Sequence, residues 1–357
     1  MPVSRLTADC IWNSFRNSGK RHLILTGGKG SGKTSLLSSM FKNNHPGLTS
    51  WAQREKAVYL KDNLTCEIVK LGVYDPSLSG SENKMVLHGD AFVNFVIPAL
   101  NRCMENESPW VTIDEVGYLE ADCDEYQNAL RNLLEIKQVA AVVRKQNLPF
   151  LIELCSKKDA FVVDLDEPFG KIGCVIMASG LGKRFGGNKL MANFHGRPLI
   201  CRILDTTEGI FNQRVVVTRH HEIKQLCLEH GIKTIFHNLP YRSDTVRLGI
   251  ESMLEMDRCM FAAADQPILR RETVAALVLA SKNNPSDIWR PIYDNTMGSP
   301  VIFPKWSFNE LMNLPDGKGG SVIMKKYPER VRTVNASNIY ELKDVDTPYD
   351  LRDLSEY

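Results

Sequence analysis

The chain has 357 residues, of which 43% are hydrophobic and 24% are charged, and its formal net charge is +2. This length exceeds one ordinary core and suits two domains of about 150 residues each. So small a net charge provides no field that would hold a nucleic-acid backbone, and we expect no nucleic-acid partner. No segment approaches the roughly 20 apolar residues that span a bilayer, and no apolar signal segment stands near Met1. We therefore expect a cytoplasmic protein without membrane contact.

The nine cysteines are scattered along the chain and form no C-x-x-C pair. An odd number without paired spacing predicts neither a disulfide framework nor a zinc site. We expect most of the cysteines to be small residues of the core.

From the N-terminus onward, short apolar runs alternate with longer segments of helical period. This alternation is typical of parallel sheets covered by helices, so the predicted fold class is α/β. The expected strands are, in chain order, residues 23–25, 111–113, 140–143, 160–163, 174–177, 215–217, 234–236, 260–263 and 300–303.

An acidic segment at residues 164–171, DLDEPFGK, contains both Pro and Gly and separates the expected strands of the two halves. Such a composition is typical of a connection between domains. We therefore predict two domains, one at residues 1–168 and the other at residues 171–357.

A glycine-rich segment, GGKGSGKT, follows the first expected strand and opens a helical segment. It fits the pattern G-x-x-x-x-G-K-[ST], in which backbone N–H groups at a helix N-terminus surround phosphate oxygens. We predict that Lys33 reaches the β- and γ-phosphates of a bound NTP and that Thr34 ligates Mg²⁺. The residues expected to hold this nucleotide are Gly27, Gly28, Lys29, Gly30, Ser31, Gly32, Lys33 and Thr34.

The strand WVTI ends in Asp114 and Glu115, which supply the acidic partner that a P-loop requires on a neighbouring strand. We predict that Asp114 holds the magnesium shell and that Glu115 orients or deprotonates an attacking water. An exposed acid at a strand end is the simpler alternative for Glu115. Arg144, which follows another expected strand, is a candidate sensor of the γ-phosphate, although an exposed loop arginine is the more ordinary interpretation.

Over residues 20–165 the chain resembles the thermophile-type nucleoside-triphosphatases, which have a RecA-like fold. The resemblance rests on GGKGSGKTSLL, IDEVGYLE and GDAFVNFVIPAL. It implies slow hydrolysis of NTPs, with ATP or GTP as the substrate of this domain. A small-molecule kinase is the alternative, but a kinase needs arginines on a closing lid, and the sequence has none between Arg54 and Arg102.

A second glycine-rich loop, residues 178–189, follows the strand CVIM. Its spacing superficially suits a dinucleotide site, but such a site needs an acidic residue after the next strand, and this loop carries three cations instead. Three positive side chains at the carboxyl edge of a sheet suit an NTP whose bond between the α- and β-phosphates breaks. We predict that Arg184 and Lys189 stabilise the departing pyrophosphate. The loop residues expected to contact the nucleotide are Ala178, Ser179, Gly180 and Leu181.

The strand MFAAA ends in Asp265, which a proline follows two residues later. This strand end is expected at the same edge of the sheet as the basic loop. We predict that Asp265 ligates Mg²⁺, since Mg²⁺ takes one or two carboxylates together with substrate phosphates.

Two further aspartates, Asp344 and Asp346, stand near the C-terminus and offer a second contact to the metal. We favour a role in helix capping for Asp346, because Thr347 and Asp350 fit a capping box with a proline at the first helical position.

Residues 172–355 resemble the MobA-like nucleotidyltransferases, which have a Rossmann-like fold of the nucleotide-diphospho-sugar transferase type, and within them the molybdenum-cofactor cytidylyltransferase branch. The likeness runs in order through MASGLGKRFGGNKL, HGRPLI, ADQP, GSPVIF, DGKGG and DVDTPYDL. It implies transfer of CMP, or of another NMP, from an NTP to the terminal phosphate of molybdopterin with release of pyrophosphate. CTP is therefore the expected donor, and an apo molybdenum hydroxylase is a further partner that the resemblance suggests.

An acceptor that is already an anion needs no protein nucleophile, so catalysis would consist of positioning and of charge neutralisation by Mg²⁺ and the basic loop. Two alternatives stay open. In one, the P-loop cycle drives delivery of a cofactor that the second domain only binds. In the other, the acceptor is a sugar phosphate or a polyol phosphate, which the same loop and aspartate would serve.

Overall fold

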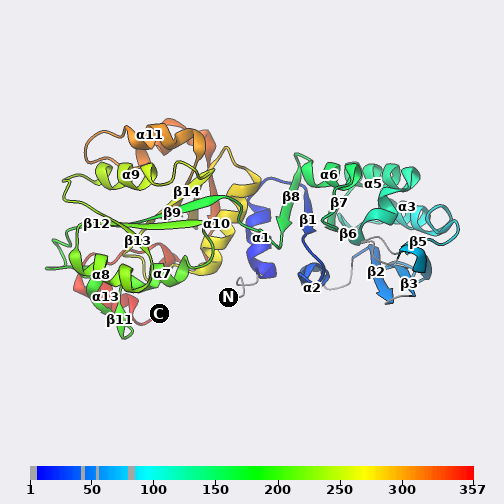
Figure 1. Cartoon of the computed structure of the whole chain (residues 1–357), viewed down its shortest axis with the longest axis horizontal. Helices are drawn as coiled ribbons and strands as arrows, with labels where there is room; N and C mark the ends of the chain where they lie inside the picture. Colours follow the sequence, from blue (N-terminus) through cyan, green and yellow to red (C-terminus); the bar gives the residue numbers. More distant parts are fainter. Residues whose placement is uncertain (1–5, 42–44, 54–55, 79–84) are drawn as a thin grey trace. The chain divides into compact units, whose positions relative to one another are not determined.

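The protein is described from a computed structural model, which covers residues 6–41, 45–53, 56–78 and 85–357 (Figure 1). The chain divides into two compact units. One consists of residues 18–168 and is called the P-loop unit below; the other consists of residues 1–17 together with residues 169–357 and is called the second unit.

The P-loop unit is built on a sheet with the strand order β5-β4-β3-β2-β6-β7-β1-β8. The five strands from β2 to β8 in this order are parallel, whereas β3, β4 and β5 extend the sheet by antiparallel pairing. The strands are β1 (His22–Thr26), β2 (Gly47–Gln53), β3 (Ala57–Asp62), β4 (Ile68–Tyr74), β5 (Met85–Leu87), β6 (Trp110–Val116), β7 (Gln138–Val143) and β8 (Ala160–Asp164).

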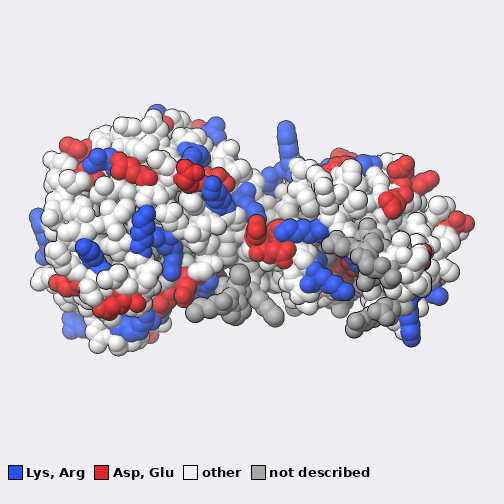
Figure 2. All heavy atoms as spheres, in the orientation of Figure 1, with Lys and Arg blue, Asp and Glu red and all other residues white. Residues whose placement is uncertain are grey.

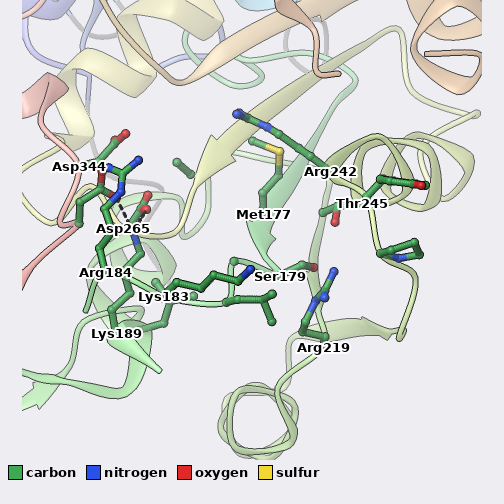
Figure 3. A pocket seen from close by; sticks show the side chains of 18 residues that line it. Met177, Ser179, Lys183, Arg184, Lys189, Arg219, Arg242, Thr245, Asp265 and Asp344 are labelled. Carbon is green, nitrogen blue, oxygen red and sulfur yellow. Dashed lines mark hydrogen bonds and ion pairs between the residues drawn. The ribbon is translucent and has the colours of Figure 1, made fainter. Parts of the chain in front are cut away.

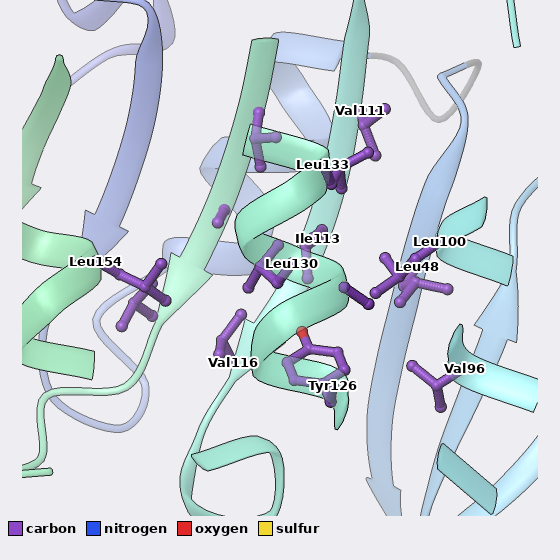
Figure 4. Close-up of a cluster of buried hydrophobic side chains, with 14 of the residues drawn as sticks. Leu48, Val96, Leu100, Val111, Ile113, Val116, Tyr126, Leu130, Leu133 and Leu154 are labelled. Carbon is purple, nitrogen blue, oxygen red and sulfur yellow. The ribbon is translucent and has the colours of Figure 1, made fainter. Parts of the chain in front are cut away.

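Helices cover this sheet and supply much of the apolar core. They are α2 (Lys33–Phe41), α3 (Ile97–Glu105), α4 (Tyr118–Ala121), α5 (Asp124–Ile136) and α6 (Pro149–Ser156). Figure 4 shows Tyr126, Leu130 and Leu133 of α5 facing Val111 and Ile113 of β6, and all five side chains are buried. The spacing of the three helix residues places them on one face, so α5 is held on the sheet by burial of that face.

The second unit contains a sheet with the strand order β13-β12-β9-β14-β17-β15-β16, and β18 pairs with β15. The strands β13, β12, β9 and β14 are parallel, and β17 joins β14 in antiparallel pairing. The strands are β9 (Ile172–Ala178), β12 (Gln213–Thr218), β13 (Lys233–Phe236), β14 (Arg258–Ala263), β15 (Ile288–Tyr293), β16 (Thr296–Met297), β17 (Val301–Pro304) and β18 (Val331–Asn335). A separate two-stranded ribbon is formed by β10 (Asn193–Phe194) and β11 (Arg197–Pro198).

The main helices of the second unit are α1 (Ala8–Arg16), α7 (Cys201–Thr206), α8 (His221–Glu229), α9 (Arg242–Glu251), α10 (Arg271–Asn283), α11 (Phe308–Met312), α12 (Ser321–Lys326) and α13 (Pro348–Leu354). The predicted fold class is confirmed, because both units combine helices with a sheet in which parallel pairs form the centre. Within the described part of the chain, none of the helices is long and apolar enough to cross a membrane.

The N-terminal helix α1 packs on α10 and so belongs to the second unit, whereas the sequence placed residues 1–168 in one domain. Ile11 is completely buried, and the hydroxyl of buried Ser14 donates a 3.0 Å hydrogen bond to the carbonyl of Ala276 in α10. The difference has a physical cause: the apolar face of α1 finds its partner in α10, far along the sequence. The P-loop unit is therefore an insertion between α1 and the remainder of the second unit.

The chain returns to the second unit at Phe169, where a buried arginine binds the backbone carbonyl. The guanidinium of Arg258, which is 4% exposed, donates to the carbonyls of Phe169 and Val278 and to the hydroxyl of Ser281. Burial lowers the pKa of Arg258 to about 10. Three oxygen partners compensate for much of the cost of burying this charge.

Candidate active sites

A pocket of about 600 Å³ lies at the carboxyl ends of β9, β12 and β14 in the second unit (Figure 3). Ligands bind at this edge of open α/β sheets because the loops that follow the strands surround it. The pocket collects most of the residues that the sequence predicted for this domain, namely Ser179, Gly180, Leu181, Arg184, Lys189 and Asp265. Ala178 is different: it is completely buried as the last residue of β9 and does not line the pocket.

Lys189 and Asp265 form an ion pair in this pocket, with 2.6 Å between Nζ and Oδ2. The ammonium group also donates to the carbonyl of Val345 and to Oδ1 of Asp346, at 2.6 and 3.1 Å. Burial lowers the pKa of Lys189, but the carboxylates of Asp265 and Asp346 outweigh burial, so its pKa is raised overall. Lys189 is thus a fixed, permanently charged group beside Asp265.

Asp346 joins both predicted cations, because its other carboxylate oxygen accepts a 2.8 Å hydrogen bond from Arg184. The sequence favoured helix capping for Asp346, and here the structure differs. Thr347 and Asp350 make the capping box of α13, while the carboxylate of Asp346 faces the basic loop. Only its backbone N–H takes part in the cap, by donating to Asp350.

Asp344 is a further carboxylate of the pocket. Desolvation, and then the negative charge of Asp265, raises the pKa of Asp344 to about 6. Among the described residues, no group of three or more His, Cys, Asp or Glu side chains is arranged to hold a metal ion. Mg²⁺ needs only one or two carboxylates beside substrate phosphates, so the pair of Asp265 and Asp344, which repel each other, fits such an ion.

His237 lies behind Ser179, which lines this pocket, and was missed from the sequence, where no motif surrounds it. Its Nε2 lies 2.9 Å from the hydroxyl of Ser179, and its Nδ1 accepts a hydrogen bond from the N–H of Leu239. Since the Ser179 hydroxyl itself donates to the carbonyl of Val217, the histidine is assigned as neutral with its proton on Nε2. Burial, and next Arg219, lowers the pKa of His237, which agrees with the neutral form. Its position just after β13, beside β12, is the signal that would have drawn attention to it.

The predicted phosphate loop of the P-loop unit connects β1 to α2. Gly27, Gly30 and Gly32 adopt positive φ angles of 141°, 79° and 94°, which glycine tolerates without strain. The ammonium of Lys33 donates to the carbonyls of Gly27 and Gly28 at 2.8 and 2.7 Å, so the side chain lies along the loop. The strand-loop-helix context predicted for this motif is therefore present.

Thr34 and Asp114 lie together, as expected of two metal ligands. The Thr34 hydroxyl donates a 2.9 Å hydrogen bond to Oδ1 of Asp114, which is 6% exposed. Burial raises the pKa of Asp114 to about 6. A hydroxyl oxygen and a carboxylate oxygen at the phosphate loop are the hard ligands that Mg²⁺ takes, so the residues fit this ion.

Glu115 and Arg144 are paired with each other. Glu115 has a φ of 84°, in the left-handed region that is unusual for residues other than glycine, and the pairing of β6 with β7 is irregular between Ile113 and Val116. This backbone irregularity accompanies the turn of Glu115 toward Arg144, whose guanidinium also lies 5.6 Å from the Tyr118 ring centre. The roles of Glu115 as a base and of Arg144 as a sensor stay predictions.

Asp166 is an unexpected neighbour of the phosphate loop. Its carboxylate accepts hydrogen bonds from the N–H of Gly28, with distances of 2.9 and 3.1 Å, and lies 3.2 Å from Nζ of Lys145. The sequence treated this residue as part of a connecting segment only. Of the two arginines that bounded the kinase alternative, Arg54 lies outside the described residues, and Arg102 pairs with the fully buried side chain of Asp62.

The chain is thus an α/β protein with a glycine-rich phosphate-loop motif in one unit and a basic pocket in the other, each beside a carboxylate that fits a divalent metal. Family comparison agrees with this class. Residues 174–331 match the MobA-like NTP transferase domain, and residues 74–168 match the NTPase family, a match that begins after the phosphate loop. The chain therefore joins an N-terminal NTPase domain to a C-terminal MobA-like NTP transferase domain, as the two resemblances predicted, while the cytidylyltransferase branch stays a prediction.

Curated relatives match parts of the chain. A probable molybdenum cofactor guanylyltransferase of Bacillus licheniformis is 29% identical over 107 residues, which are 29% of this chain and 53% of that protein. One of Aquifex aeolicus is 26% identical and covers 28% and 49% of the two chains. The bifunctional protein GlmU of Thermosipho africanus is 26% identical over 190 residues, or 48% of this chain and 42% of its own length. The chain thus spans about half the length of these relatives.

Solved structures align with half of the chain. A nucleotidyl transferase from Methanothermobacter is 19% identical, with a TM-score of 0.46, and covers 52% of this chain and 97% of its own. The CMP:2-keto-3-deoxy-manno-octonic acid synthetase, solved with CTP, is 15% identical, with a TM-score of 0.45, and covers 52% and 98%.

Proposed function

We propose that the second unit transfers a nucleoside monophosphate, CMP in the first instance, from an NTP to the terminal phosphate of molybdopterin. In this reaction an oxygen of the acceptor phosphate forms a bond to the α-phosphorus, the bond between the α-phosphorus and the bridging oxygen breaks, and pyrophosphate leaves with that oxygen. The observation that carries the proposal is the convergence of Lys189, Arg184 and Asp265 in one pocket at the carboxyl edge of the sheet. The domain's membership of the MobA-like NTP transferases supports it.

The roles of the residues follow from their charges. Lys189 and Arg184 would stabilise the negative charge that grows on the departing pyrophosphate, since fixed cations cost no reorganisation during the reaction. Asp265, with Asp344 beside it, would hold Mg²⁺, which when bound neutralises phosphate charge and orients the triphosphate. The acceptor phosphate is itself the nucleophile, so positioning and charge neutralisation account for the whole proposed reaction.

The identity of the base in the donor nucleotide requires a direct comparison of CTP with GTP. The resemblance to the cytidylyltransferase branch favours CTP, whereas two of the relatives described above are named as guanylyltransferases. Ser179, which His237 holds at the end of β9, stands in the loop that would face the donor. CTP and GTP are therefore both assayed as donors.

For the P-loop unit we propose hydrolysis of an NTP, ATP or GTP, with Mg²⁺ held by Thr34 and Asp114. The hydrogen bond between these two side chains and the course of Lys33 along the phosphate loop support this activity. An apo molybdenum hydroxylase as recipient of the finished cofactor is part of the same proposal.

The test is the release of pyrophosphate by the full chain from CTP, GTP or ATP, with molybdopterin and Mg²⁺. We expect release that needs both acceptor and metal and that is fastest with CTP. Release with N-acetylglucosamine 1-phosphate but not with molybdopterin would transfer the proposal to sugar phosphates. Tight binding of molybdopterin without any pyrophosphate release would instead favour a delivery protein.

A further inference from the structure

A second cavity of about 320 Å³ in the second unit adjoins the pocket of about 600 Å³ that contains Lys189 and Asp265, which is called the donor pocket below. The two share Met177, Arg242 and Asp344 as lining residues, so a molecule in the second cavity has direct access to the donor. Figure 3 shows Met177 and Arg242 on the side of the donor pocket away from Lys189. The size of this cavity lies at the lower end of the range for small-molecule sites.

Apolar side chains make up much of the wall of the second cavity. Phe261 and Phe303 are 4% and 2% exposed and meet edge to face, with 5.9 Å between ring centres and 79° between ring planes. A methyl group at Gly320 would come within 2.4 Å of the Phe303 ring, so the backbone there packs directly on the aromatic wall. Such a packed apolar wall suits a flat, unsaturated ring better than a polyhydroxylated one, whose hydroxyls would lose their hydrogen bonds to water.

Arg290 of β15 lies among these apolar residues with few partners. Its Nε donates a 3.0 Å hydrogen bond to the carbonyl of Gly298, and its NH1 has only the sulfur of Met324, at 3.8 Å. It forms no ion pair with a carboxylate in the described part of the chain, and burial lowers its pKa. A guanidinium has five N–H donors, so Arg290 keeps donors for a ligand, in contrast to Arg258 with its three oxygen partners.

Gln266 lines the same cavity and supplies the opposite kind of group. It is 3% exposed, and its Nε2 donates to the carbonyl of Leu342. Its Oε1 is buried and accepts a hydrogen bond from none of the described residues. A buried acceptor without a partner is costly, so a ligand that donates to it would gain affinity.

We propose that Arg290 and Gln266 determine which molecule receives the nucleotide. They do so by forming hydrogen bonds with a flat heterocycle that has both donor and acceptor groups. The heterocycle lies against Phe261 and Phe303, Arg290 donates to a ring nitrogen or carbonyl oxygen, and Oε1 of Gln266 accepts from an N–H group. The assignment of this molecule as the acceptor rests on the proposed nucleotidyl transfer; the occupancy of the cavity by such a heterocycle does not.

The binding test uses the full chain and 6-hydroxymethylpterin, which has such a ring but no phosphate, with ring fluorescence as the readout. The variants are Arg290→Met, Arg290→Lys and Gln266→Met. The control is Arg332→Met on the neighbouring strand β18, which lies opposite Trp289 of β15 but outside the cavity and is exposed. We expect Arg290→Met and Gln266→Met each to weaken binding by about 10-fold or more, the size expected for losing hydrogen bonds to a charged or otherwise unpaired buried group. Arg290→Lys should retain part of the affinity, and Arg332→Met all of it.

Failure of the inference and failure of the proposed reaction have different signatures. Wild-type protein that does not bind the pterin, or Arg290→Met and Gln266→Met that bind it as wild type does, would overturn the inference even if pyrophosphate release occurs. Pterin binding that these variants weaken supports it even if no pyrophosphate is released. In the complete reaction with molybdopterin and CTP, we expect Arg290→Met to raise the KM for molybdopterin and to leave the KM for CTP unchanged. A purely structural effect of Arg290, which donates to the carbonyl of Gly298, would raise both KM values. Thermal melting checks that the variants fold.

Discussion

The Nζ of Lys189 lies 2.6 Å from Oδ2 of Asp265, although the lysine follows β9 and the aspartate follows β14. These parallel strands are neighbours in the sheet, so their carboxyl ends deliver a cation and a carboxylate to one point. A triphosphate bound with its metal, as proposed above, would present complementary charges to both groups: phosphate oxygens to the lysine and the metal to the aspartate. One ion pair thus places Lys189, which would stabilise the departing pyrophosphate, beside the proposed metal ligand.

The two sites should be separable by single substitutions. We expect Asp265→Ala to lower pyrophosphate release by about 100-fold or more, because a metal and its charge stabilisation are lost. We expect Lys33→Ala to abolish NTP hydrolysis, because the charge expected to contact the β- and γ-phosphates is lost. Each variant is assayed for both activities, and each should retain the activity of the unit that carries no substitution. Our assignment is wrong if Asp265→Ala keeps full pyrophosphate release while Lys33→Ala abolishes it.

Asp346 and Asp350 offer a matched comparison four positions apart. Asp346→Asn removes the charge that holds Arg184 and Lys189, and we expect a loss of about 10-fold or more in the rate of pyrophosphate release, as for other residues that orient active-site groups. Asp350→Asn weakens only the cap of α13 and should cost about 1 kcal/mol of stability, measured by thermal melting, with little change in rate. Equal effects of the two substitutions on rate would return Asp346 to a capping role.

Much of both sites was predictable because consecutive residues make them. The phosphate loop and the basic loop each contain their glycines and cations in one stretch, so Lys33, Arg184 and Lys189 are visible as motifs. The rule that parallel strands end at one edge of the sheet also placed Asp265 at the same edge as the basic loop.

The remainder depends on contacts that no local pattern encodes. His237, Arg290 and Gln266 matter through neighbours brought together by the sheet, and α1 joins the second unit because its partner α10 follows far later in the chain. The strands β2 to β5 were not predicted at all. β2 and β4 each combine buried with exposed residues in no simple alternation, so the period of two is weak there.

Asp166 should weaken the binding of NTP to the phosphate loop. Its carboxylate occupies the N–H of Gly28, and a negative charge at that place repels phosphate. We expect Asp166→Asn to lower the KM for NTP hydrolysis by about threefold to tenfold, the size expected for one partly screened charge. Asp164→Asn is the control, since Asp164 pairs with the same Lys145, at 2.8 Å. A raised KM in Asp166→Asn would show that the carboxylate supports nucleotide binding instead.

His237 predicts that stability depends on pH below about 6.5. Its folded-state pKa lies below the ordinary histidine value of about 6.5, so the unfolded chain binds the extra proton more readily. The stabilisation from this residue is therefore complete above that value and is lost as the pH falls below it. A protonated ring would also direct a second donor at the N–H of Leu239 and disturb Ser179. Melting temperature and the KM for CTP should both worsen below pH 6.5, more in wild type than in His237→Gln, and the exposed-site control His230→Gln should follow wild type.

The placement of α1 in the second unit predicts where an N-terminal substitution acts. Ile11 is completely buried against the second unit, so Ile11→Ala should destabilise that unit by about 2–5 kcal/mol through lost burial and a cavity. Calorimetry that resolves the two units should show that the melting temperature falls for the second unit only. Pyrophosphate release should also be lost faster on heating. Ile152→Ala, at a half-exposed position of α6 in the P-loop unit, is the control and should change stability by no more than about 0.5 kcal/mol. A shift of the P-loop unit's transition in Ile11→Ala would mean that α1 stabilises residues 18–168 instead.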